Sequence, residues 1–154
     1  MPYKRVDLAL AAFEQLGSPL VVAGTGRQVD ELRAAAPPNA RFVGRVEDDE
    51  LPALLAGARS LVFPGVEDFG ITPVEAMAAG TPVVAYGRGG VLDTVTDGES
   101  GVLFHEQTPE ALAAAVRRAE AEAWDRRAIS ASTRRFAEDR FVREVSEVAN
   151  DVVS

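Results

Sequence analysis

The chain has 154 residues, 47% apolar and 26% charged, which suits one globular domain with a hydrophobic core. Its formal net charge of −8 argues against general attraction to nucleic acid or anionic lipid, although it leaves a local basic pocket open. With no cysteine and one histidine it lacks the residues for disulfides and for cysteine- or histidine-rich metal sites, and no apolar run is long enough to cross a bilayer. We therefore expect a soluble, cytoplasmic protein without a metal site.

The predicted elements alternate between helices and short apolar strands. In chain order we expect a helix over 5–16, a strand over 19–24, a helix over 27–36, a strand over 41–45, a helix over 47–58, a strand over 60–65, a helix over 72–80, and strands over 81–86 and 101–104. From Thr108 onward the pattern is helical, with a break near Trp124. Strands that are continuously apolar indicate a parallel sheet covered on both faces, so we predict a doubly wound, Rossmann-like α/β fold in one domain.

The segment after the strand over 60–65 carries the candidate site, because ligands in such sheets bind where strands end and helices begin. Here Glu67 and Glu75 flank a loop that contains Gly70 and Thr72. One interpretation is a capping box, in which Thr72 is the N-cap, Pro73 the first helical residue and Glu75 the residue that reaches back to the helix start. Glu67 would then be a solvated loop acid.

A second interpretation uses the same geometry to bind a ligand. Backbone N–H groups of Phe69, Gly70 and Ile71 at a helix N-terminus can hold a diphosphate without lysines. Glu75 would accept hydrogen bonds from the vicinal hydroxyls of a ribose, and Glu67 would bind hydroxyls on the far side of the phosphates. This arrangement points to a nucleotide-sugar, and the spacing alone leaves both interpretations open.

The same segment resembles a known family. EDFGITPVEAMAAGTPVVA, with Glu67 and Glu75 separated by seven residues, resembles the signature of the retaining, GT-B-fold glycosyltransferases of family 4, or glycosyl transferases group 1. Four further segments resemble family segments in the same order, namely PYKRVDLALAAFEQL, LVVAGTGRQVDELRA, RFVGRVEDDELPALLAGARSLVFP and GRGGVLDTVTDGESGVLF. The likeness is to the C-terminal, donor-binding half, so residues 1–154 are expected to form a nucleotide-sugar-binding domain.

The resemblance implies roles for individual residues. Glu67 resembles the acid that faces the transferred sugar, and Lys4 resembles the basic residue that contacts the diphosphate; we take both as the catalytic candidates. Glu75 resembles the acid that binds the ribose. The remaining substrate-binding candidates are the loop residues Phe69, Gly70, Ile71 and Thr72, the glycine turn with Gly24 and Gly26, and backbone near Val43 and Arg45.

The implied reaction is transfer of a sugar from a nucleotide-sugar with retention of configuration, without a cofactor. The sequence of residues 65–95 most resembles mannosyltransferases of this family, which favours GDP-mannose, with UDP-sugars as the alternative. The acceptor would be a glycan or a lipid-linked saccharide, held by an N-terminal domain that this sequence lacks. A full-length protein could be peripheral to the inner membrane.

Two departures from the family pattern affect these expectations. The acceptor-binding half is absent, and so is the strand that precedes Met1 in family members, which would be the first and most central of the sheet. Its loss should expose the edges of the strands over 19–24 and 60–65. We therefore expect a fragment with little or no activity alone. The alternatives are a non-catalytic nucleotide-sugar-binding module and, with no matching loops, a sugar-nucleotide epimerase.

Overall fold

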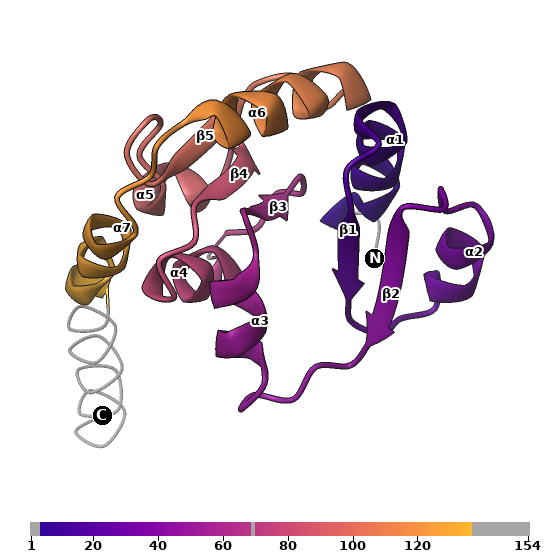
Figure 1. Ribbon diagram of the computed structural model, residues 1–154, viewed down its shortest axis with the longest axis horizontal. Helices are drawn as coiled ribbons and strands as arrows, with labels where there is room; N and C mark the ends of the chain where they lie inside the picture. The colour runs from indigo at the N-terminus through magenta and orange to yellow at the C-terminus, as the bar shows by residue number, and fades with distance from the viewer. Residues whose placement is uncertain (1–3, 69, 137–154) are drawn as a thin grey trace, which may run out of the picture.

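The computed structural model describes residues 4–68 and 70–136, over which helices and parallel strands alternate (Figure 1). The helices are α1 (Val6–Leu16), α2 (Val29–Ala34), α3 (Leu51–Gly57), α4 (Ile71–Ala78), α5 (Val91–Thr94), α6 (Pro109–Ala121) and α7 (Arg126–Ser132). The strands are β1 (Leu20–Ala23), β2 (Ala40–Gly44), β3 (Leu61–Phe63), β4 (Val83–Tyr86) and β5 (Gly101–Phe104). The predicted α/β alternation is confirmed. Phe69 and the end of the predicted terminal helix lie outside the described residues.

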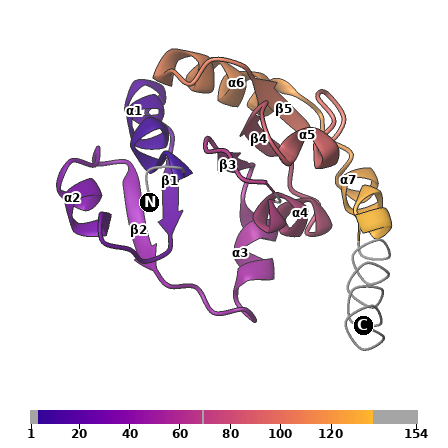
Figure 2. The ribbon, with the colours of Figure 1, turned by 180° about the vertical axis from the view of Figure 1, so that it is seen from behind.

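The strands form two parallel sheets instead of the one sheet that the sequence predicts. β1 pairs with β2, and β3, β4 and β5 pair in that order. Figures 1 and 2 show the two sheets on opposite sides of the described chain, with β1 and β3 as the strands that face each other. If the two sheets are written side by side, the strand order is β2-β1 followed by β3-β4-β5. This is the order of a doubly wound sheet with one position open between β1 and β3.

β4 is the most deeply buried strand because helices cover both of its faces. Val84 packs into a cluster with α1, α6 and β5, whereas Val83 and Ala85 pack into a second cluster with α3, α4, α5 and α7. All three side chains have no exposed surface. Burying a valine of this kind stabilises the fold by about 1.5–3 kcal/mol, so the packing on both faces of β4 contributes strongly to stability.

Several predicted boundaries are corrected by local chemistry. The helix expected over 47–58 begins only at Leu51, so the acids of residues 47–50 lie in a turn before it and not in its first turn. α5 follows the glycine-rich loop after β4 and was not predicted, because four residues are too few to show a helical period. α7 begins at Arg126, where the Asp125 carboxylate accepts a hydrogen bond from the Ala128 N–H at 3.0 Å.

Two side-chain contacts tie the last helices to the rest of the fold. Arg126 donates to the carbonyls of Gly80 and Ala56, each at 2.9 Å, and to the Thr81 hydroxyl at 2.8 Å, which holds the start of α7 against α3 and α4. Arg118 of α6 forms a two-pronged ion pair with Asp97, at 3.0 and 3.1 Å. These contacts fasten α6 and α7 to the loops on either side of β4.

The Asp97 carboxylate titrates below its ordinary range. Partial burial pulls the pKa of Asp97 upward, but hydrogen bonds from Arg118 and from the Leu103 N–H, together with the charge of Arg118, outweigh that effect and lower the pKa overall. The Leu103 N–H bond is 2.8 Å long, so Asp97 joins the turn before β5 to the strand itself.

Candidate functional site

The start of α4 does not contain the capping box that the sequence allows. Gly70 is the N-cap, no side chain caps the helix, and Thr72 and Pro73 are its second and third residues. Pro73 is tolerated there because the first N–H groups of a helix have no partner inside the helix. A Cβ at Gly70 would lie 3.1 Å from the Pro73 ring, so the glycine makes room for this buried proline. The prediction of Thr72 as N-cap is therefore wrong, as is that of Pro73 as first helical residue.

Without a cap, the first turn of α4 has unused hydrogen-bond donors. Among the described residues, the N–H groups of Gly70, Ile71 and Thr72 have no acceptor. The Ile71 and Thr72 side chains are exposed, so a ligand can approach this end of the helix. The helix dipole places about half a positive charge there, and no lysine, arginine or histidine occurs from Ser60 to Gly87. The geometry suits an anion bound by backbone amides.

Glu67 is positioned by the loop between β4 and α5. Its carbonyl oxygen accepts a hydrogen bond from the Gly90 N–H at 2.9 Å. Gly89 has a left-handed φ of 76°, and a Cβ there would come within 2.8 Å of the same oxygen. Gly89 and Gly90 therefore approach the backbone of Glu67 closely. This close approach fixes the loop, which also carries the exposed Arg88.

The Glu67 and Glu75 carboxylates are both free for a ligand within the described part of the chain. The structure gives neither of them a hydrogen bond or ion pair with another described residue. Glu75 is exposed on α4 and Glu67 is half-buried in the loop before it. The Gln107 side chain supports the start of this loop by donating to the Pro64 carbonyl at 3.1 Å.

The other predicted site residues lie apart from this loop, on the sheet of β1 and β2 or before α1. Gly24 adopts a φ of 123° at the end of β1 and donates to the Gly44 carbonyl at 2.7 Å. Gly26 follows in an open turn, Val43 is half-buried in β2, and Arg45 pairs with Glu47 at 3.5 Å. Lys4 is exposed in the turn before α1. No hydrogen bond or ion pair among the described residues joins this group to the segment of Glu67 and Glu75.

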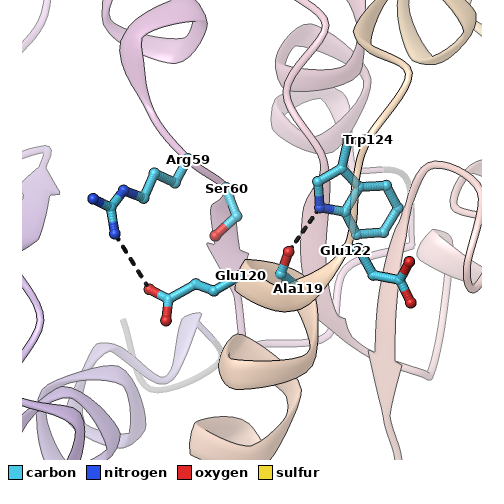
Figure 3. Close-up of a pocket in the computed structure, with 6 residues that line it drawn as sticks. All are labelled: Arg59, Ser60, Ala119, Glu120, Glu122 and Trp124. Carbon is cyan, nitrogen blue, oxygen red and sulfur yellow. Dashed lines mark hydrogen bonds and ion pairs between the residues drawn. The ribbon is translucent and has the colours of Figure 1, made fainter.

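The structure also contains a pocket of about 240 Å³, which lies away from the predicted site (Figure 3). It is lined by Arg59, Ser60, Ala119, Glu120, Glu122 and Trp124. Ser60 precedes β3, whereas the Glu67 loop follows it, so the pocket lies at the opposite end of that strand. Its one arginine is 3.9 Å from Glu120, and the Trp124 indole N–H donates to the Ala119 carbonyl at 2.8 Å. Two acids beside one paired arginine do not favour a diphosphate.

Comparison with known proteins identifies the family. A family model described as glycosyl transferases group 1 matches residues 1–136. The chain belongs to this family. Glycogen synthase of Mycobacterium tuberculosis is 40% identical over 125 residues, which cover 74% of this chain and 30% of that protein. D-inositol 3-phosphate glycosyltransferase of Salinispora tropica is 36% identical over 119 residues, covering 74% of this chain and 25% of its own length.

Solved structures of glycosyltransferases share the fold. Anabaena HepE, crystallised with UDP-glucose, superposes with a TM-score of 0.77 at 26% identity and covers 99% of this chain. Sucrose-phosphate synthase of Thermosynechococcus elongatus gives a TM-score of 0.80 at 25% identity and the same coverage. This group 1 chain spans 46% of HepE and 43% of the synthase, so it matches one Rossmann-like part of the GT-B fold.

The described residues also bear on the expectations about membranes and metals. No helix among them is long and apolar enough to cross a membrane. Nor do they contain a group of three or more histidine, cysteine, aspartate or glutamate side chains arranged to hold a metal ion. Transfer without a cofactor stays a prediction.

Proposed function

We propose that this chain is the donor-binding part of a glycosyltransferase and that it binds a nucleotide-sugar at the start of α4. The observation that carries the proposal is the uncapped helix N-terminus, where the amides of Gly70, Ile71 and Thr72 have no acceptor among the described residues. Membership of the glycosyl transferases group 1 family supplies the ligand class. Backbone amides would bind the diphosphate, Glu75 the ribose hydroxyls and Glu67 the sugar.

The reaction proposed for a complete transferase retains the configuration of the sugar. The bond between the anomeric carbon and the diphosphate oxygen breaks, and its electron pair leaves with the nucleoside diphosphate. An acceptor hydroxyl then bonds to the anomeric carbon from the same face, and its proton leaves with the diphosphate. The amides at the start of α4 would stabilise the negative charge that develops on the diphosphate, and Lys4 is the proposed second source of positive charge.

Two observations support different donors, a UDP-sugar and GDP-mannose. HepE was crystallised with UDP-glucose, which supports a UDP-sugar. The resemblance of residues 65–95 to mannosyltransferases favours GDP-mannose instead. We propose that the donor is a nucleotide-sugar that carries a hexose. A direct comparison of the affinities for UDP-glucose and GDP-mannose distinguishes the two bases. The acceptor would be a glycan or lipid-linked saccharide bound by other parts of a complete enzyme, so we expect this chain alone to bind donor without transferring sugar.

Calorimetric titration of the chain with UDP, GDP, UDP-glucose and GDP-mannose tests the proposal. The Glu75→Gln variant should bind the preferred nucleotide about 10–100-fold more weakly, because a carboxylate that accepts hydrogen bonds from hydroxyls contributes about 1.5–3 kcal/mol. Glu14→Gln is the control, because Glu14 is an exposed glutamate of α1 without a partner among the described residues. Equal affinity of the two variants would refute the role of Glu75. Transfer of sugar by this chain would refute the expectation that it binds the donor without catalysing the reaction.

A further inference from the structure

Three connections leave the sheet of β3, β4 and β5 at the same edge. The strands are parallel neighbours, so the residues that follow them lie side by side. They are the loop of residues 64–68 after β3, the glycine-rich loop of residues 87–90 after β4, and the segment of residues 105–107 between β5 and α6. Glu67 lies in the first of these, so the other two connections can influence its position.

Gly87 is required for space and not for its backbone conformation. It is not among the glycines with a positive φ, so its backbone would accept an alanine. A Cβ at this position, however, would lie 2.7 Å from Cε1 and 2.8 Å from Nδ1 of His105. The His105 imidazole therefore occupies the space that a side chain at position 87 would need. The two residues meet where Gly87 donates its N–H to the Phe104 carbonyl at 2.8 Å.

The contact with Gly87 distinguishes His105 from an ordinary surface residue. His105 is exposed, and its imidazole forms no hydrogen bond or ion pair with another described residue. A side chain that is neither buried nor held by polar bonds contributes little to the stability of the whole fold. Any effect of His105 is therefore expected to be local to the loop that it touches.

The glycine-rich loop connects this contact to Glu67. The loop begins at Gly87 and ends at the buried Gly90, whose N–H donates to the Glu67 carbonyl at 2.9 Å. Gly89 lies between them, and a Cβ there would come within 2.8 Å of the same oxygen. Because only four residues separate the imidazole from the Glu67 carbonyl, a shift of Gly87 must displace the hydrogen bond at the other end of the loop.

The segment of residues 105–107 also supports the loop of Glu67 directly. The Gln107 side chain donates to the carbonyl of Pro64, a buried residue that follows β3 immediately, at 3.1 Å. His105 thus contacts the start of the loop after β4, and Gln107 contacts the start of the loop after β3. The Glu67 loop is held at both of its ends by these contacts.

We propose that His105 is a positioning residue for Glu67. Its imidazole packs on Gly87, holds the glycine-rich loop beside β5 and, through the Gly90 N–H, fixes the Glu67 carbonyl. The consequence for a ligand rests on the proposed function, in which Glu67 binds the sugar and backbone amides bind the diphosphate. His105 then affects the affinity for a nucleotide-sugar and leaves that for a nucleoside diphosphate unchanged.

The test compares variants that remove, retain or displace the ring. His105→Ala removes it, and His105→Phe retains a flat ring at the same place. Gly87→Ala displaces it, because the new Cβ needs the same space. Glu106→Ala is the control, because Glu106 is an exposed neighbour whose side chain has no hydrogen bond or ion pair among the described residues.

Amide hydrogen exchange of Gly90, measured by NMR, reports on the hydrogen bond to Glu67. The Val83 amide, which donates to the Ser100 carbonyl at 3.1 Å, is the internal reference. Relative to this reference, His105→Ala should speed the exchange of Gly90 about threefold or more, while its urea midpoint stays near that of wild type. His105→Phe and the control should leave the exchange near that of wild type.

Gly87→Ala tests the same contact from its other side. It should speed the exchange of Gly90 when His105 is present, because the displaced ring no longer holds the loop. In the His105→Ala background it should add little, because the ring that it displaces is already gone. An equal effect in both backgrounds would show that the two residues act independently and would overturn the proposal.

Calorimetric titration with UDP, UDP-glucose, GDP and GDP-mannose measures the effect on a ligand. His105→Ala should weaken binding of the preferred nucleotide-sugar about 3–10-fold, as a partly lost hydrogen bond does, and leave the affinity for the corresponding diphosphate unchanged. A general loss of structure at the site would weaken both by the same factor, so the difference between the two ligands distinguishes positioning of Glu67 from damage to the fold.

The remaining outcomes separate the two proposals. Unchanged exchange of Gly90 in His105→Ala, or equally fast exchange in His105→Phe or the control, would overturn the role of His105. Faster exchange without a selective loss of nucleotide-sugar affinity would refute its effect on the sugar. If wild type binds none of the four nucleotides, the proposed function fails, and the exchange of Gly90 alone decides whether His105 positions Glu67.

Discussion

Replacing Gly89 by alanine should destabilise the fold more than its backbone conformation alone explains. Gly89 has a φ of 76°, and alanine in a left-handed conformation costs about 1–2 kcal/mol. The new Cβ would also lie 2.8 Å from the Glu67 carbonyl oxygen, a backbone atom that must move and thereby lengthen its 2.9 Å hydrogen bond from Gly90. Losing that bond adds about 1 kcal/mol, so the expected total is about 2–3 kcal/mol.

Two matched variants separate strain from contact. Gly98 has a similar φ of 83°, but the closest atom to its added Cβ is 3.7 Å away, so Gly98→Ala should cost about 1–2 kcal/mol from strain alone. Gly26 has open space around it and no left-handed φ, so Gly26→Ala should change stability by less than about 0.5 kcal/mol.

Urea unfolding followed by circular dichroism gives the free energy of unfolding of each variant. The expected order of destabilisation is Gly89→Ala, then Gly98→Ala, then Gly26→Ala. If Gly89→Ala costs no more than Gly98→Ala, the contact with Glu67 does not constrain the loop, and the positioning role argued for Gly89 is wrong. Nucleotide affinity should fall in Gly89→Ala and stay unchanged in Gly98→Ala, because only the former displaces Glu67.

Three further predictions concern stability. Because α4 has no side-chain cap, Thr72→Ala and Glu75→Ala should each lower the free energy of unfolding by less than about 0.5 kcal/mol in urea titrations; a loss near 1 kcal/mol for both would restore the capping box. Arg126→Met should lower it by about 1–3 kcal/mol, and Arg126→Lys should recover only part, since a lysine cannot reach three acceptors at once; equal stability of the methionine variant would contradict this anchor for α7. Since the pKa of Asp97 is lowered in the fold, its pairing with Arg118 should stabilise the protein above the ordinary carboxyl pKa of about 3.9 and lose that effect as pH falls further. Asp97→Asn should therefore be less stable than wild type at pH 6, by at most about 1 kcal/mol because the pair is exposed. This stability difference should shrink as the pH falls to 2.5, and a constant difference would refute the stabilising role of the pair.

The strands were predictable because each is a short apolar run bounded by glycine, proline or a polar turn. The structure places β1, β3, β4 and β5 within the predicted ranges, and β2 begins one residue before its predicted start. The parallel pairing followed from the absence of polar alternation, most clearly in Val83 and Val84, which are buried on opposite faces of β4. The described strands form two sheets and not one, and β1 and β3 each pair with a single described strand, as expected for a doubly wound sheet whose first central strand is missing.

The start of α4 was not predictable from capping rules. Thr72, Pro73 and Glu75 have the spacing of a capping box, but the helix begins at Ile71, because the buried Pro73 ring packs against Gly70. Spacing rules count along the chain and do not include such contacts. The support that Gly89 and Gly90 give to Glu67 was likewise hidden, since these residues are more than twenty positions apart and meet only across the ends of β3 and β4.

A titration followed by NMR tests most directly whether a diphosphate binds at the start of α4. UDP-glucose and GDP-mannose are added in turn to the labelled chain, and shifts of backbone amides and of the Trp124 indole N–H are recorded. We predict the largest changes at Gly70, Ile71 and Thr72, whose N–H groups have no acceptor among the described residues, and none at Trp124, whose indole lines the pocket at the other end of β3. Shifts centred on Trp124, or no shifts with either nucleotide, would contradict a donor site at this helix.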